Sequence, residues 1–178
     1  MRLLRSEHAR DLDGMDCAVG VDNVPESVRT LSSLPDLHYA DCFTLSTDAE
    51  ATPEQWARTT FGDVPNAGER LIWRGFLGLR LSRGRSPETV AGWRITARGQ
   101  DWIRLEAASW FLTANLVLRA ADGRVSLGTF LRHDRHLGHG VWRTLSPVHR
   151  YLAPRALRAA VARNERRHRS SQRGDQAT

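Results

Sequence analysis

Histidines at three-residue spacing are the first feature of this chain that could do chemistry. His133, His136 and His139 follow one another, and Asp134 stands beside the first of them. Imidazole and carboxylate groups are ligands that zinc and iron accept, so a metal site has to be considered. However, steps of three residues drift around a helix axis, and we expect a strand to end near His133. We therefore interpret the set as a polar strand-to-helix junction, and we expect no metal or other cofactor.

Three titratable side chains could act as general acids or bases, namely Glu106, His133 and His149. Glu106 lies in the middle of an apolar strand sequence, where a carboxylate that faced a pocket could move a proton. The alternation places it instead on the face that carries arginines, so we favour an ion pair across strands with Arg94 or Arg132. An enzyme alternative, a cyclase- or dehydratase-like reaction that uses the three groups, stays open. No serine has the glycine pattern of a nucleophile elbow, so a hydrolase triad is not expected.

A further group of residues could hold a ligand without reacting with it. Ser109 and Thr129 lie on the apolar face of the predicted sheet or at its ends, and His149 lies on the helix that follows. Polar groups in such places could orient a molecule bound in an apolar cavity. Backbone carbonyls could equally satisfy them. The apolar side chains that we expect around the ligand are Trp93, Leu105, Leu116, Leu127 and Trp142.

The elements that must position these residues follow from hydrophobic periodicity. Residues 90–133 have the alternation of four strands in succession, with a break near Ser109 to Leu112. An amphipathic helical segment extends from about residue 136 to 163. Pro147 and Pro154 should kink or divide that segment, because proline cannot donate the helical hydrogen bond.

Ahead of these strands the sequence predicts one further strand and two short helices. The strand covers residues 37–47, where apolar residues alternate imperfectly. The first helix begins at residues 52–55, which form a capping box with proline at the first helical position. The second helix follows Pro65 and contains Gly75 and Gly78, so we expect it to be bent or partly irregular.

The alternation predicts a sheet with one buried face and one face in water. Trp93, Leu105 and Leu116 belong to the apolar face, whereas Arg94 and Glu106 belong to the other. The C-terminal helix is the long helix available to cover the apolar face. The predicted fold class is therefore α+β, a curved antiparallel β-sheet packed against a long C-terminal helix, with two short helices after the first strand. We expect five strands and a pocket between the sheet and the helix.

Composition divides the chain into three parts. Residues 1–36 are acidic and are expected to form a poorly ordered arm, residues 37–162 form the domain, and residues 163–178 form an arginine-rich flexible tail. The formal net charge of +6 rests on arginine, because the chain contains no lysine. This excludes Schiff-base chemistry and lysine-dependent phosphate loops. No recognised nucleic-acid motif accompanies the arginines, so we expect no nucleic-acid partner.

The sequence also bears on compartment. The apolar run 107–118 is shorter than the ~20 residues that a membrane-spanning helix needs, so no membrane insertion is expected. The N-terminal residues show no apolar core of a secretory signal. Cys17 and Cys42 have neither a disulfide framework nor metal-ligand spacing, so we expect reduced thiols in a cytoplasmic protein.

Several short phrases resemble a known family. They lie between residues 37 and 162 and are Tyr39-Ala40-Asp41 with Phe43, Pro53-Glu54-Gln55-Trp56-Ala57, Gly92-Trp93-Arg94-Ile95, Leu105-Glu106-Ala107 with Ser109-Trp110, Thr129-Phe130 and Pro147-Val148-His149-Arg150. In these phrases and in its order of elements the chain resembles the START-like helix-grip superfamily, which includes polyketide cyclase-like proteins. More narrowly, it resembles an uncharacterised bacterial family, a domain of unknown function. The resemblance implies a helix-grip fold with room for an apolar cavity and brings no established activity. The five expected strands are fewer than a full helix-grip sheet has.

Three functions follow as expectations. The favoured one is non-covalent binding of a small apolar molecule between the sheet and the C-terminal helix. The second is the cyclase- or dehydratase-like enzyme, which a buried titratable residue facing a real void would favour. The third is a homodimer or scaffold with a filled core, which the absence of a pocket above ~300 Å³ would favour.

Overall fold

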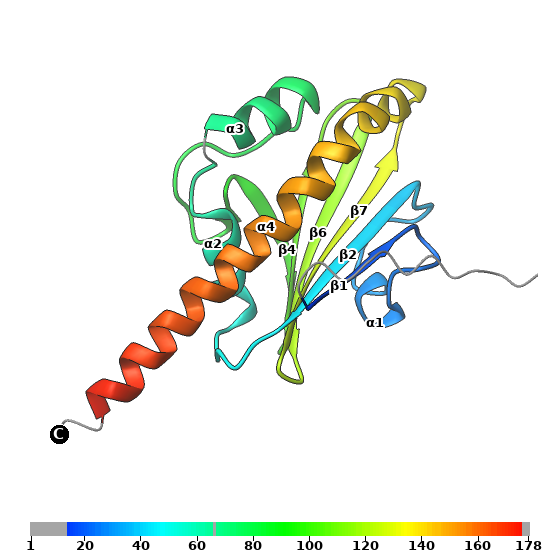
Figure 1. Ribbon diagram of the computed structural model, residues 1–178. Helices are drawn as coiled ribbons and strands as arrows, with labels where there is room; N and C mark the ends of the chain where they lie inside the picture. Colours follow the sequence, from blue (N-terminus) through cyan, green and yellow to red (C-terminus); the bar gives the residue numbers. More distant parts are fainter. Residues whose placement is uncertain (1–13, 66, 176–178) are drawn as a thin grey trace, which may run out of the picture.

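The computed structural model describes residues 14–65 and 67–175, which are built on a seven-stranded antiparallel sheet (Figure 1). The strand order is β1-β2-β7-β6-β5-β4-β3, so β7 lies beside β2 although they are far apart in sequence. The strands are β1 (Met15–Val19), β2 (Tyr39–Ser46), β3 (Thr89–Val90), β4 (Trp93–Arg98), β5 (Trp102–Ala108), β6 (Leu112–Ala121) and β7 (Arg124–His133).

One long helix lies along one face of this sheet, as Figure 1 shows. The helices are α1 (Glu26–Arg29), α2 (Pro53–Phe61), α3 (Ala67–Arg70), the π-helix η1 (Leu71–Phe76) and α4 (His136–Asp175). Helix α4 contacts β2, β7 and α2. The predicted fold class is confirmed: the fold is α+β, with a curved antiparallel sheet, short helices after β2 and a long C-terminal helix.

The main core lies between the sheet and helices α2 and α4. The register places Leu105 opposite Leu116 and Leu118 opposite Leu127, and all four side chains are buried. Leu157 of α4 belongs to the same cluster. Because successive strand residues point to opposite faces, the alternating apolar positions form one continuous layer. This is the face that the alternation predicted as apolar.

The opposite face is partly covered, which corrects the prediction that it lies wholly in water. Val24 and Val28, from the segment around α1, pack there against Cys42, Val117 and Phe130. This second, smaller core lies over β2, β7 and β6. The prediction missed it because Val24 and Val28 lie in a segment without a periodic pattern, and because Val117 stands between Leu116 and Leu118, where a continuous apolar run does not separate the two faces.

The sheet has two strands more than the five expected, β1 and β3, and they form its two edges. Both are short, as edge strands commonly are, and β1 carries Asp16 in its second position. The structure also places β1 and α1 inside the segment 1–36 that was predicted as a poorly ordered arm. Residues 1–13 of that arm lie outside the described residues.

The prolines Pro147 and Pro154 were predicted to kink or divide the segment; helix α4 extends unbroken to Asp175, so the division does not occur. A proline inside a helix removes one hydrogen bond, and packing of the flanking turns against the sheet offsets that cost. The helix also continues through most of the predicted tail, 163–178. Arginine is a good helix former, and this segment contains neither glycine nor proline before Gly174.

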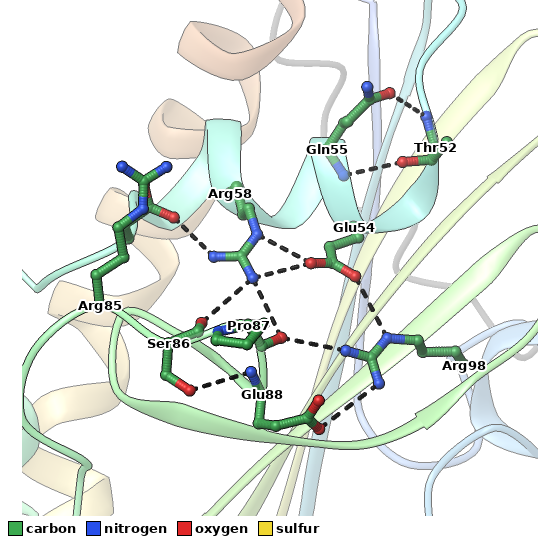
Figure 2. A network of polar contacts seen from close by, with 10 residues as sticks. Thr52, Glu54, Gln55, Arg58, Arg85, Ser86, Pro87, Glu88 and Arg98 are labelled. Carbon is green, nitrogen blue, oxygen red and sulfur yellow. Dashed lines mark hydrogen bonds and ion pairs between the residues drawn. The ribbon is translucent and has the colours of Figure 1, made fainter.

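Helix α2 begins at the predicted capping box, which is drawn in Figure 2. The backbone N–H of Gln55 donates to the Thr52 hydroxyl at 3.2 Å, and the Gln55 side chain accepts from the Thr52 N–H at 2.8 Å. Pro53 occupies the first helical position, where its missing N–H leaves no bond unmade. The local sequence alone therefore determines where this helix starts.

A network of arginines then holds α2 against the β3–β4 edge of the sheet (Figure 2). Arg58 donates to the Glu54 carboxylate at 2.8 Å and to the carbonyl of Pro87 at 3.3 Å. Arg98 of β4 donates to the same carboxylate at 3.3 Å and to the same carbonyl at 3.2 Å. These contacts fix the position of Phe61, which ends α2 and lines the pocket described below.

The second short helix is irregular, as its glycines predicted. One α-helical turn, α3, is followed directly by the π-helix η1. Its wider turn is closed by the Leu77 N–H, which donates to the Ile72 carbonyl at 2.9 Å. π-Helical segments occur frequently at functional sites, and this one supplies Ile72 and Trp73 to the pocket wall, followed by Leu77 directly after its end.

Candidate functional site

A pocket of about 460 Å³ lies between the sheet, α4 and η1. The sheet contributes apolar side chains such as Leu116 and Leu127, α4 contributes Trp142 and Leu145, and η1 contributes Trp73. Its walls are mostly apolar and aromatic with few polar groups. A ligand site for a small apolar molecule has this composition.

Two larger hollows have a different character. One, of about 750 Å³, lies beside the start of α2 and the β4–β5 turn, and the other, of about 680 Å³, lies between α2 and the outer half of α4. Charged side chains such as Glu54, Arg98, Arg85 and Arg167 line them. Both are open surface grooves, so the smaller apolar pocket is the better candidate site.

The structure brings most of the predicted ligand-binding residues to this pocket. Six of them lie in its wall, namely Trp93, Leu116, Leu127, Thr129, Trp142 and His149. Leu105 does not, because it is fully buried in the core. Ser109 does not either: its hydroxyl accepts from the Leu112 N–H at 3.1 Å and shapes the turn between β5 and β6.

A buried polar cluster lies at one side of the pocket. The Asp41 carboxylate is 0% exposed, and its Oδ2 accepts from the Tyr39 hydroxyl at 2.6 Å. The same oxygen lies 3.0 Å from Nε2 of His149, and this Nε2 also lies 3.2 Å from the Thr129 hydroxyl. Burial and the neighbouring carboxylate raise the pKa of Tyr39 far above its ordinary value, so its hydroxyl stays a donor.

Three elements assemble this cluster. The register of β2 and β7 sets Asp41 opposite Thr129, and Tyr39 lies two residues before Asp41 on the same face. Trp142 precedes His149 by two helical turns on α4 and packs against Tyr39, with ring centroids 4.9 Å apart. The Trp142 and His149 ring centroids are 5.2 Å apart, so the indole holds both the tyrosine and the imidazole in place.

The hydrogen bonds determine what His149 can do chemically. A carboxylate can only accept, so Nε2 of His149 carries the proton that is donated to Asp41. In the neutral ring Nδ1 then has the free lone pair and can accept a proton or a hydrogen bond. A histidine held by a buried carboxylate at a pocket wall can orient a ligand hydroxyl or act as a general base.

Several polar atoms around the pocket have no partner among the described residues. They are Asp41 Oδ1, Trp93 Nε1 and Trp142 Nε1, and all three are buried. Buried polar atoms are nearly always hydrogen-bonded, so each unpaired one calls for an explanation. Trp93 and Trp142 line the pocket, so an acceptor group on a ligand would satisfy their indole N–H groups.

Sequence reasoning missed Tyr39 and Asp41 as site residues. A signal was present, because Asp41 alternates with Phe43 and Leu45 on the core face of β2. A carboxylate at an apolar strand position is costly to bury unless it is hydrogen-bonded. Its partner His149 is 108 residues away in the chain, and no local pattern connects the two.

Glu106 lies on the sheet face opposite the pocket. Its carboxylate is 3.6 Å from Arg94, which confirms the predicted cross-strand ion pair. It also accepts from Asn115 and from the Ser33 hydroxyl, each at 3.2 Å. Glu106 is therefore not positioned to act on a molecule in the pocket.

His133 meets His139, which belongs to the set singled out in the sequence, and His38, which does not. Its ring contacts His139 and stacks on His38, with centroids 4.4 Å and 5.2 Å away, whereas His136 is exposed. Burial, together with the nearby His139 and His38, lowers the pKa of His133 to about 4. Within the described ranges no three His, Cys, Asp or Glu side chains are arranged to hold a metal ion.

None of the helices in the described ranges combines the length and hydropathy that a bilayer crossing requires. Cys42 is a buried thiol outside any disulfide. Burial raises the pKa of the Cys42 thiol to about 12, so it stays protonated on the face away from the pocket.

Comparisons with known proteins add little to this picture. No family model matches the chain, and no curated protein matches it. Among solved structures the chain is similar to the crystal structure of CalU16 from Micromonospora echinospora, with 14% sequence identity, coverage of 85% of this chain and 94% of that chain, and a TM-score of 0.32. A likeness at this level carries no argument, so the helix-grip-like description of the fold rests on its own strands and helices.

Proposed function

We propose that this protein binds a small, mostly apolar molecule in the pocket between the sheet and α4. The observation that carries the proposal is the pocket itself, about 460 Å³ in volume and lined by Trp73, Trp93 and Trp142. Pockets of ~300–1,000 Å³ with apolar walls and a few polar groups are typical of ligand sites. His149 and Thr129 supply those polar groups at one side.

Native mass spectrometry of freshly purified protein tests the proposal most directly. An additional small mass that is lost on unfolding supports ligand binding. A second test uses the fluorescent apolar probe 1-anilinonaphthalene-8-sulfonate, because excitation of the pocket tryptophans transfers energy to a probe beside them. We expect probe fluorescence to rise on addition of the protein.

A matched pair of variants locates the probe. Ala156 lines the pocket, whereas Ala159, one turn further along α4, is exposed. Ala156→Trp places a large side chain in the pocket and is expected to weaken probe binding at least tenfold. Ala159→Trp makes the same exchange on the outer face and should leave binding unchanged. Equal probe binding by both variants, in a protein without a bound mass, would refute the proposal.

A second candidate function is an acid–base enzyme of the cyclase or dehydratase type that uses the same pocket. The observation that favours it is the buried Asp41 carboxylate 3.0 Å from His149, which orients the histidine for proton transfer. In a dehydration, His149 would take a proton from the carbon beside a carbonyl group and return it to the departing hydroxyl. The C–H and C–O bonds break, a C=C bond forms and water leaves.

The ligand-binding function and the enzyme function predict different masses for the molecule bound in the pocket. An enzyme that lacks its base accumulates substrate, so His149→Gln should carry a molecule heavier by one water than any molecule bound to the unmodified protein. A binding protein carries the same molecule in both forms. The third expectation, a module with a filled core, loses its supporting observation because the pocket exceeds ~300 Å³.

A further inference from the structure

Large apolar side chains are exposed on both sides of the pocket opening. Leu71 and Phe76 stand on η1, and Val148, Tyr151 and Leu152 stand on the facing turns of α4. Each of them is between 43% and 60% exposed. Apolar side chains gathered in this way commonly mark a surface that meets a partner.

These residues form two lips around the opening. Their immediate neighbours Ile72 on η1 and Ala153 on α4 line the pocket, and Val148 and Leu152 belong to both the wall and the exposed surface. The mouth of an apolar pocket is thus surrounded by apolar side chains instead of a polar rim. An apolar ligand leaving the pocket would pass directly between the lips.

The charge of α4 adds a second, independent observation. From residue 136 to 164 the helix contains five arginines and no aspartate or glutamate. Arg155 lies at the pocket mouth, where its guanidinium is 3.5 Å from the Tyr151 ring centroid. Arg166 follows three helical turns after Arg155, so exposed arginines continue along the outer side of the helix. Glu69, on the opposite lip, is the acidic residue of the pocket wall.

We propose that the two lips and the arginines of α4 dock the pocket mouth on the surface of an anionic lipid bilayer. A helix with apolar and aromatic side chains beside arginines is the kind that lies in a membrane interface. A bilayer also suits the pocket, because its hydrocarbon lets an apolar ligand enter without crossing water. A protein that covered both lips would instead close the opening. This inference rests on the proposed ligand-binding function.

Binding to vesicles tests the docking surface. We expect the protein to sediment with vesicles of phosphatidylglycerol and phosphatidylcholine, and much less with vesicles of phosphatidylcholine alone. An arginine near an anionic surface strengthens binding by about fivefold, so Arg155→Gln and Arg166→Gln should each weaken it by that factor. Phe76→Ser should weaken it about tenfold, because the side chain no longer enters the interface. Thermal melting confirms that each variant is folded.

The control is Arg94→Gln, which removes an equal charge on the sheet face turned away from α4. It should leave vesicle binding unchanged, and an effect as large as that of Arg155→Gln would overturn the proposal. Failure to bind anionic vesicles, or equal binding to both kinds, would also overturn it. Phe76 and Arg166 do not line the pocket, so their variants should keep the bound mass or the probe. If the unmodified protein carries a ligand but does not bind anionic vesicles, only the docking is refuted, whereas an empty pocket in the unmodified protein refutes the ligand function.

Discussion

Exchange of Asp41 for asparagine is expected to lower the free energy of unfolding by about 2–4 kcal/mol. The carboxylate is 0% exposed and accepts from Tyr39 at 2.6 Å and from His149 at 3.0 Å. Hydrogen bonds to a charged group contribute about 1.5–3 kcal/mol each, and loss of the charge weakens both. Burying the neutral asparagine side chain costs less desolvation free energy than burying the carboxylate, which offsets part of that loss.

Urea unfolding followed by tryptophan fluorescence measures the effect. The control is Asp101→Asn, because the Asp101 carboxylate also accepts from a side chain, that of Arg119 at 2.8 Å, but these two side chains are about one-third exposed. Exposed pairs of this kind contribute less than about 1 kcal/mol. If Asp41→Asn costs no more than Asp101→Asn, the buried cluster does not stabilise the fold and the reasoning is refuted.

A double-mutant cycle with His149→Gln isolates the contact between the two side chains. We expect a coupling energy of about 1–2 kcal/mol, since removal of either partner already breaks the hydrogen bond. Strict additivity of the two losses would show that Asp41 and His149 do not act as a pair. The ligand-orienting role of His149 would then lose its structural basis.

Three further predictions concern stability. The pKa of His133 is lowered from its ordinary 6.5 to about 4, so below pH 6.5 the unfolded state binds a proton that the folded state does not. The free energy of unfolding should therefore fall by about 1–2 kcal/mol between pH 6.5 and 4, and by less in His133→Gln. If the melting temperatures of the two proteins fall in parallel with pH, the prediction is contradicted. Gly128→Ala should destabilise by about 1–3 kcal/mol in urea unfolding, because its Cβ would lie 2.9 Å from the Phe130 ring, whereas Gly140→Ala meets no atom within 4 Å and should be neutral or stabilising. Trp142→Ala should cost about 3–5 kcal/mol by emptying core volume, and a loss below 1 kcal/mol would show that the indole does not support α4.

Much of the fold was predictable because its signals are local. The capping box at Thr52 depends on four consecutive residues, and the alternation in β5 to β7 reflects one solvent-shielded face along each strand. The fold class follows from these patterns together with the long C-terminal helix. The edge strands β1 and β3 escaped prediction because an edge position requires no periodic burial. The second core escaped it because Val28 and Phe130 become neighbours only through the path of the chain.

The candidate site shows the same division. Trp93, Leu116, Leu127, Thr129, Trp142 and His149 could be named from the sequence because periodicity assigns each to the inner face of a strand or helix. Periodicity cannot distinguish a residue that lines a pocket from one that fills the core, which is why Leu105 was included with them.

Which faces are apolar, where α2 begins and that the positive charge rests on arginine can all be read from the residues alone. That Asp41 meets His149, that His133 meets His38 and that a pocket remains between sheet and helix is known only from the folded chain. The difference lies in the range of the interactions. Backbone hydrogen bonding and burial act along neighbouring residues and leave a pattern in the sequence. Contacts between distant segments depend on register and on how α4 crosses the sheet, and neither leaves such a pattern.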